Sequence, residues 1–335
     1  MPTAHNILEA LNDVLVPGIQ RNINSLNLVQ DTSIEGNKVT VTLASTGLDE
    51  NALGWIKNKS VEVIKQLGDR LDVNVTFIDK KPAELNRVKN IIAVMSGKGG
   101  VGKSLVTALT AILLRRQGYE VGILDADITG PSIPKMFGIT THPQGTESGI
   151  LPVQSANGIE LISINLFLPS EDEAVIWRGP MIGKAITQFW EDVIWGNLDF
   201  LIVDLPPGTA DAPLTALQVL PVSGAIVVFT PQDLTTMIVK KAVKMAQQMD
   251  KKVIGVVENM SYLYVPELNK KIELFGKSRG DEMAKASGAP LLARIPIDPE
   301  LALLCDEGHI ERYNADVLKS YGEMLTAAIA DIKAK

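Results

Sequence analysis

The sequence predicts an α/β fold with a doubly wound, mainly parallel sheet, preceded by a small α+β domain. Three observations support this prediction. From about residue 90 onward, short apolar runs alternate with stretches of helical spacing, which is typical of parallel strands joined by crossover helices. A glycine-rich loop connects one such run to a helical stretch. The first 80 residues differ, because their pattern reads α-β-β-α-β.

The small domain is expected over residues 1–80. A polar linker that contains a proline follows at 81–89, and the large domain is expected over 90–335. Turn residues separate the elements of the small domain. Its expected elements are a helix at 7–15, hairpin strands at 26–34 and 38–43, a helix at 49–67 and a strand at 73–78.

The large domain is expected to alternate strands and helices along its length. Its expected strands lie at 91–95, 121–125, 159–164, 200–204, 224–229 and 253–259. In open sheets of this kind, ligands bind outside the carboxyl ends of the strands. Polar residues that follow these strands are therefore the first candidates for a functional site.

The segment from Gly97 to Ser104 fits the phosphate-loop pattern G-x-x-x-x-G-K-[ST]. Glycines allow such a loop to turn its backbone N–H groups inward around phosphates. Lys103 is expected to reach the outer phosphates, and the hydroxyl of Ser104 to ligate Mg²⁺. The predicted nucleotide-binding residues of the loop are Gly97, Lys98, Gly99, Gly100, Val101, Gly102, Lys103 and Ser104.

Three carboxylates follow strands at the expected edge of the sheet. Asp204 ends an apolar strand and is predicted to order Mg²⁺ or its bound water. Of Asp125 and Asp127, one could order the attacking water while the other helps to hold the metal shell. Each could instead cap the next loop. Asn259 ends a later strand, and its amide suits either an adenine edge or the closing of a turn.

Composition narrows the class of protein. The formal net charge of −7 argues against nonspecific binding to nucleic acid and against an anionic membrane surface. No stretch approaches the length of a membrane-spanning helix, and the N-terminus lacks the basic and apolar regions of a signal peptide. The single cysteine, Cys305, excludes an internal disulfide framework. We therefore expect a cytoplasmic enzyme with no membrane or nucleic-acid partner.

Several motifs together resemble a known family. Lys98-Gly-Gly-Val-Gly-Lys-Ser104 is similar to the deviant Walker A motif shared by the nitrogenase iron protein and the MinD and ParA ATPases. Within this class of ATPases, the chain resembles the Mrp/ApbC iron–sulfur cluster carriers. Four segments carry the resemblance: Asp125-Ala-Asp-Ile-Thr-Gly-Pro-Ser-Ile-Pro134, Trp177-Arg-Gly-Pro180, Asp204-Leu-Pro-Pro-Gly-Thr209 and Glu258-Asn-Met-Ser-Tyr262. The small domain resembles an iron–sulfur assembly domain.

The resemblance implies a slow, homodimeric ATPase that uses Mg²⁺ and works with iron–sulfur assembly or client proteins. Lys98 would cross the dimer interface to the nucleotide of the partner subunit, and would act in catalysis with Lys103 and Asp127. Asp127 would position the attacking water, and Asn259 would contact adenine. The expected Mg²⁺ ligands, direct or through water, are Ser104, Asp125 and Asp204.

The chain departs from the family at its cluster-binding segment. The family carries C-P-x-C, whereas this chain has Val265 and Leu268 at the two cysteine positions, with Pro266 retained. Valine and leucine offer iron no lone pair, and the small domain also lacks its usual cysteine. Cys305 lies in an apolar helical stretch and is expected to be structural. No iron–sulfur site is therefore expected.

Three functions follow from these observations. The first is the family function, an ATPase that carries iron–sulfur clusters. The second is a cluster-free relative that uses the ATP-driven dimer switch as an adaptor or regulator, including as a heterodimer with a cysteine-bearing paralogue. The third is a MinD/ParA-like positioning ATPase, which would need a membrane-targeting tail or basic patches. The mixed-charge helix expected at 316–333 offers neither.

Overall fold

The computed structural model describes residues 2–19, 21–68, 70–127, 130, 132–167, 179–209, 211–232 and 235–333. The chain divides into two compact units. The first comprises residues 1–88, 142–154 and 188–198. The second comprises residues 89–141, 155–187 and 199–335. Two segments from beyond residue 90 thus group with the N-terminal residues, a feature that no sequence motif marks.

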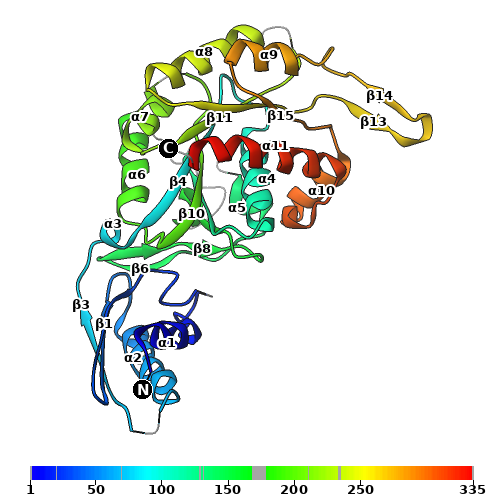
Figure 1. Cartoon of the computed structure of the whole chain (residues 1–335). Coiled ribbons are helices and arrows are strands. Elements are labelled where there is room, and N and C mark those ends of the chain that lie inside the picture. Colours follow the sequence, from blue (N-terminus) through cyan, green and yellow to red (C-terminus); the bar gives the residue numbers. More distant parts are fainter. Residues whose placement is uncertain are drawn as a thin grey trace. The chain divides into compact units, whose positions relative to one another are not determined.

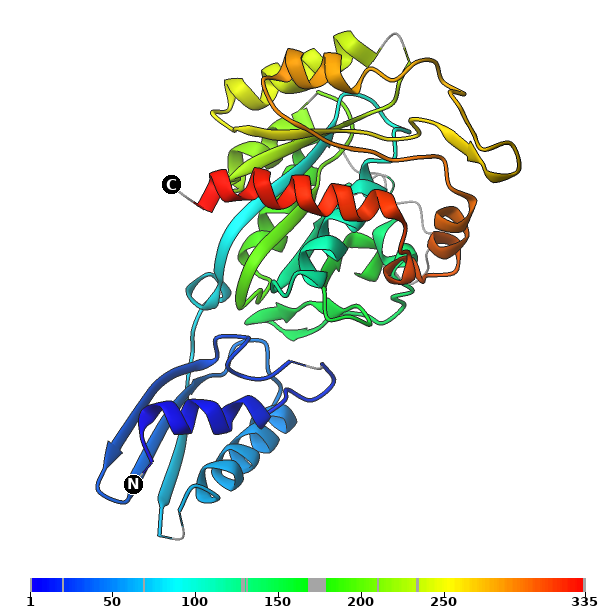
Figure 2. The same cartoon turned by 45° about the vertical axis from the view of Figure 1, so that its right-hand side comes forward.

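The first unit contains the expected order α-β-β-α-β. Strands β1 and β2 are antiparallel, whereas β2 and β3 are parallel. Helices α1 and α2 lie on one face of this three-stranded sheet (Figure 2). The elements are α1 (Ala4–Ala10), η1 (Leu11–Asp13), β1 (Val29–Glu35), β2 (Lys38–Ala44), α2 (Glu50–Lys65), β3 (Asp72–Ile78) and α3 (Pro82–Leu85).

Polar caps and an apolar face define the helices of the first unit. Thr3 and Asn6 form a capping box at α1, and Asp49 caps α2 by accepting a hydrogen bond from the N–H of Ala52. The inward face of α2 buries Ile56 and Ile64 in the core of the unit. Each such side chain contributes about 1.5–3 kcal/mol of burial free energy.

The segment 142–154, which groups with the first unit, adds three short strands. They are β6 (Gln144–Thr146), β7 (Gly149–Leu151) and β8 (Val153–Gln154).

The second unit has a parallel sheet with helices on both faces, as predicted. Its strands are β4 (Arg87–Ser96), β5 (Val121–Asp125), β9 (Glu160–Ser163), β10 (Asn197–Asp204), β11 (Gly224–Phe229), β12 (Val253–Glu258) and β15 (Leu291–Arg294). They are arranged in the order β15-β12-β11-β4-β10-β5-β9. Strand β15 was not among the predicted strands.

The helices of the second unit complete the two layers. Figures 1 and 2 show α4 and α11 on one side of the sheet and α6 and α7 on the other. The α-helices are α4 (Lys103–Arg116), α5 (Ile133–Met136), α6 (Gly179–Glu191), α7 (Asp211–Val219), α8 (Thr235–Gln248), α9 (Gly280–Ser287), α10 (Pro299–Asp306) and α11 (Asp316–Lys333). The short helical turns are η2 (Ile164–Phe167), η3 (Pro266–Leu268) and η4 (Ile310–Arg312).

A separate two-stranded hairpin follows β12. Strands β13 (Leu263–Val265) and β14 (Lys270–Ile272) pair in antiparallel fashion, with η3 between them. In Figure 1 this hairpin extends away from the central sheet of its unit. None of the helices in the described ranges combines the length and the apolar character that a membrane crossing needs.

Candidate functional site

The glycine-rich loop lies between β4 and α4, at the carboxyl end of the central strand. Gly100 and Gly102 have φ angles of +77° and +78°, which favour glycine over residues with a Cβ. At Gly97, an added Cβ would lie 2.7 Å from the backbone oxygen of Ile238. At Gly102, it would collide with the side-chain amide of Asn259. Backbone shape and close packing therefore require glycine at these positions.

Lys103 is the first residue of α4, and its side chain is only 5% exposed. Its ammonium lies 2.8 Å from Asp204 Oδ2 and 3.3 Å from Asp127 Oδ2. Burial alone would lower the pKa of Lys103, but the carboxylates of Asp204 and Asp127 outweigh it and raise the pKa above its ordinary value. The lysine is therefore a fixed positive charge at the N-terminus of the helix.

Asp204 lies at the end of β10 and is completely buried. Ser104 Oγ donates to its Oδ2 at 2.6 Å, and Thr107 Oγ1 donates to its Oδ1 at 2.7 Å. Thr107 was not predicted, since no part of the phosphate-loop pattern extends that far. It lies one helical turn after Lys103, so the same face of α4 supplies the cation and both hydroxyls.

The parallel register places Asp125 between two polar neighbours. Asp125 is paired with Asp204 on β10 and with Ser163 on β9. Ser163 Oγ donates to its Oδ2 at 2.9 Å, and the N–H of Asp127 donates to its Oδ1 at 3.2 Å. Burial, followed by the charge of Asp204, raises the pKa of Asp125 to about 8. Ser163 was also not predicted, because only strand pairing reveals it.

The residues fit Mg²⁺, the ion expected with a bound nucleotide. Ser104 would contribute a hydroxyl oxygen, and Asp125 and Asp204 would contribute carboxyl oxygens from adjacent strands. Hard oxygen donors of this kind are the ligands that Mg²⁺ prefers beside phosphates. When bound, the ion would neutralise phosphate charge at this edge of the sheet.

Lys98 and Asn259 make contacts that differ from their expected roles. Lys98 Nζ donates to Gln232 Oε1 at 2.5 Å within the same chain. Asn259 is 1% exposed, and its Nδ2 donates to the carbonyl of Val101 at 2.9 Å. Asn259 thus holds the phosphate loop against the end of β12. Its expected contact with adenine stays a prediction, as does the reach of Lys98 into a partner subunit.

The hairpin carries Val265 and Leu268, the two residues that the sequence comparison above placed at cysteine positions. Val265 ends β13, and Leu268 is 67% exposed in η3. Cys305 lies on α10, where burial, together with Asp306, raises the pKa of its thiol to about 11. None of the three therefore offers a thiolate at neutral pH.

Buried Glu258 joins the two ends of the segment that contains the hairpin. Ser261 Oγ and Ser278 Oγ each donate to its Oε2 at 2.6 Å. The N–H of Arg279 donates to Oε1 at 2.6 Å. The motif residues Trp177 and Arg178 lie outside the described residues.

Two family models match the chain. Residues 87–331 match the model of the NUBPL iron-transfer P-loop NTPase. Residues 4–77 match the model of an iron-sulfur cluster assembly protein.

Individual proteins agree with these matches. The chain is 39% identical to the iron-sulfur cluster carrier protein of Aquifex aeolicus, across 94% of both chains. A nucleotide-binding protein of Archaeoglobus fulgidus, solved in complex with ADP, is 42% identical with a TM-score of 0.64 and covers 71% of this chain and 94% of its own. The cell division ATPase MinD of Pyrococcus furiosus shares the fold, at 23% identity and a TM-score of 0.53, over 73% of this chain and 100% of its own. The chain therefore belongs to the NUBPL iron-transfer P-loop NTPase family.

Proposed function

We propose that the chain binds and hydrolyses ATP with Mg²⁺ as a cytoplasmic homodimer, and acts in iron–sulfur cluster assembly or transfer. The observation that carries this proposal is that buried Asp204 bonds to both Lys103 and Ser104 at the start of the helix that follows the glycine-rich loop. A similar protein binds ADP, and similar proteins are named iron-sulfur cluster carriers. We also propose that residues 1–80 and 90–335 are two modules joined at 81–89.

The ion pairs of Lys103 suggest how the site accepts a nucleotide. Its ammonium is neutralised by Asp204 and Asp127. The outer phosphates of ATP would compete for the same ammonium, because they bring more negative charge than a carboxylate does. Asp204 would then be available for Mg²⁺, and Asp127 would be available to orient the attacking water.

We propose further that Lys98 acts on the nucleotide of the partner subunit. A cation that arrives only when two subunits close would stabilise transition-state charge, as an arginine finger does. For this, Lys98 must exchange its hydrogen bond to Gln232 for the phosphates of the other subunit. Asp127 lies 3.3 Å from Lys103 of its own chain, so it serves its own site.

Mixing two inactive variants tests this arrangement. In a mixed dimer of Lys98→Ala and Asp127→Ala chains, one site keeps its own Asp127 and receives Lys98 from the other chain. We expect each variant alone to hydrolyse ATP slowly, and the mixture to recover up to about a quarter of wild-type turnover. The control is a mixture of Lys103→Ala and Asp127→Ala chains, in which both defects remain with their own sites. Equal rates in both mixtures would refute the action of Lys98 across the interface.

A second candidate function is a cluster-free relative that keeps the ATP-driven dimer switch as an adaptor or regulator, alone or with a cysteine-bearing paralogue. Val265 and Leu268 favour it, because neither can ligate iron. Anaerobic reconstitution with iron and sulfide separates the two candidates by iron content and charge-transfer absorption. A stable chromophore with stoichiometric iron selects the carrier, whereas colourless protein with intact ATPase activity selects the adaptor. The MinD likeness shows the fold alone, so we do not advance a positioning ATPase.

A further inference from the structure

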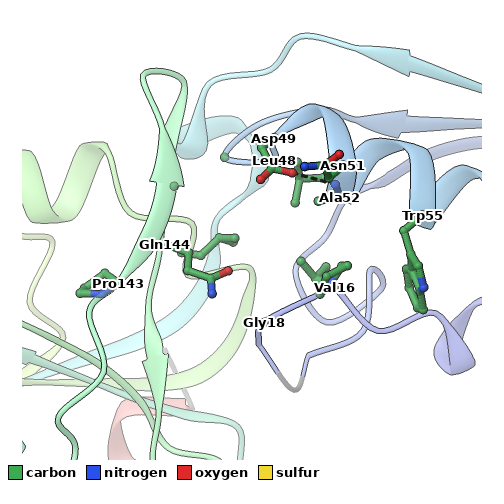
Figure 3. A pocket seen from close by; sticks show the side chains of 13 residues that line it. Val16, Gly18, Leu48, Asp49, Asn51, Ala52, Trp55, Pro143 and Gln144 are labelled. Carbon is green, nitrogen blue, oxygen red and sulfur yellow. Dashed lines mark hydrogen bonds between the residues drawn. The ribbon is translucent and has the colours of Figure 1, made fainter.

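The first unit contains a pocket remote in sequence from the phosphate loop, with a cavity volume of about 650 Å³ (Figure 3). Three segments build it: the loop after η1, the start of α2, and the β6–β7 hairpin. All of its lining residues belong to the first unit. Its volume suffices for a few amino-acid side chains.

The pocket combines a buried apolar base with an exposed aromatic ring. Val16, Leu48 and Leu151 are almost completely buried and form apolar lining. Trp55 on α2 also lines the pocket, yet it is 43% exposed. The core face of the same helix is filled by residues such as Ile56. An indole left open beside an apolar base provides a flat surface for a ligand.

The polar groups of the pocket are held in place by local structure. Asp49 Oδ1 accepts a hydrogen bond from the N–H of Ala52 at 2.7 Å, which fixes the carboxylate at the start of α2. Gln144 comes from the opposite wall, and Figure 3 shows it on one side of Val16 with Trp55 on the other. Gly18 has φ +80°, and a Cβ there would lie 2.6 Å from Gln144 Oε1. The absence of a side chain at Gly18 therefore makes room for the amide.

Charge selects the class of ligand. Among the lining residues that the structure describes, only Asp49 carries a charge. A purely apolar ligand would desolvate this carboxylate without bringing a positive charge, and an anion would be repelled by it. A guanidinium or ammonium can pair with the carboxylate, and can also stack on an indole face. An aliphatic stem or neighbouring aliphatic side chain would cover the apolar base.

We propose that this pocket binds a segment of a partner polypeptide that presents an arginine or lysine between aliphatic side chains. The basic group pairs with Asp49 and its aliphatic stem packs toward Trp55, while the neighbouring aliphatic groups lie on the base formed by Val16, Leu48 and Leu151. The amides of Asn51 and Gln144 hydrogen-bond the backbone of the bound segment. The site gives the first unit a means of choosing a partner that does not depend on the nucleotide.

Four peptides of one length, which carry a positive, a neutral or a negative side chain, test the proposal on the full chain. The peptides are Ala-Leu-X-Leu-Ala with blocked ends, in which X is arginine, lysine, citrulline or glutamate. Citrulline preserves the shape of arginine without its charge. Binding is followed by the indole N–H resonance of Trp55 in an NMR titration, assigned from the spectrum of Trp55→Phe. We expect the arginine and lysine peptides to shift this resonance in a saturable manner, and the citrulline and glutamate peptides to have little effect.

Two variants and one control connect binding to the pocket. Asp49→Asn removes the charge but keeps an N-cap residue, so α2 remains capped. We expect Asp49→Asn and Trp55→Ala each to weaken arginine-peptide binding at least about tenfold, measured by calorimetry. Glu50→Gln removes the adjacent exposed charge, which does not line the pocket, and should change affinity less than about twofold.

Three results would overturn the proposal. The first is no binding of either basic peptide up to about 1 mM. The second is equal binding of the arginine and citrulline peptides. The third is unchanged affinity in Asp49→Asn. ATP turnover measured on the same samples is independent of these results, so a failure here leaves the proposed ATPase function untouched.

Discussion

The phosphate-loop edge and the β13–β14 hairpin belong to the same unit, but their side chains differ in the chemistry that they offer. At the loop edge, buried Lys103 and partly buried Ser104 both bond to buried Asp204. At the hairpin, Val265 and Leu268 offer only hydrocarbon side chains, and Leu268 is largely exposed. The loop edge therefore presents groups that suit phosphate and Mg²⁺, whereas these two hairpin side chains present none that could bind a metal.

The contrast reflects how the two regions are built. Residues at the loop edge are connected through shared partners. The single carboxylate of Asp204 bonds to Lys103, Ser104 and Thr107. Replacing any of them leaves a buried partner unsatisfied, at a cost of about 1–3 kcal/mol or more for a charged group. The hairpin tip has no such network among the described residues, so substitution there carries little structural penalty. Chemistry can therefore be lost at the hairpin without loss of the fold.

Among the variants considered, removal of the buried lysine should reduce activity the most. Lys103→Ala takes away the buried cation at the start of α4 and leaves Asp204 and Asp127 close together without it. We expect ATP turnover to fall at least about a hundredfold, measured by phosphate release. Lys89→Ala is the matched control, because Lys89 is 72% exposed and pairs with Asp199 at the surface. Retention of more than a tenth of wild-type turnover would contradict the assigned role.

Adding thiols to the hairpin tests whether its side chains alone prevent it from binding iron. The double variant Val265→Cys with Leu268→Cys should bind iron and sulfide under anaerobic reconstitution, whereas the wild type should not. The reason is that thiolates supply the lone pairs that valine and leucine lack. Iron content and visible absorption measure the result, with either single variant as control. A double variant as colourless as the wild type would show that the hairpin geometry, and not only its side chains, has departed from cluster binding.

The free energy of unfolding should depend on pH because several carboxyl groups lie close together at the loop edge. The pKa of Asp125 is raised from its ordinary 3.8 to about 8, so the folded chain holds a proton that the unfolded chain loses. The resulting stabilisation is complete below about pH 4 and is lost as the pH rises toward 8, by up to about 1.4 kcal/mol per pH unit. Urea unfolding of the nucleotide-free chain measures it. Asp125→Asn should flatten the profile, while exposed Asp13→Asn should leave it unchanged. A slope that persists in Asp125→Asn would assign the proton to another group.

Shortening an exposed side chain of the hairpin has the smallest expected effect. Leu268→Ala should change the free energy of unfolding by less than about 0.5 kcal/mol, because Leu268 is 67% exposed. Leu124→Ala, at a completely buried position of β5, should cost about 2–5 kcal/mol in the same urea measurement. A cost above about 1 kcal/mol for Leu268→Ala would reveal a packing partner in solution.

The sequence predicted the elements whose signals are local. Fixed spacing identified Lys103 and Ser104, and strand-end position identified Asp125 and Asp204, which the sheet brings into register. Thr107 and Ser163 were missed, because their roles depend on helix phase and on strand neighbours rather than on a motif.

Other features escaped prediction for the same reason. The bond of Asn259 to the loop and that of Lys98 to Gln232 both join residues more than a hundred positions apart. Strand β15 was also missed. The grouping of residues 142–154 with the first unit likewise has no local signature.

The bonds of Glu258 have a consequence for how this family can change over time. Ser261 and Ser278 both donate to one oxygen of this carboxylate, so the segment between them begins just after β12 and ends just before α9 at a single point. A segment held at its base in this way can be shortened, lengthened or changed in sequence with little effect on the strand and the helix that flank it. Glu258 thus lets the hairpin vary in sequence and length while the sheet of the unit stays the same.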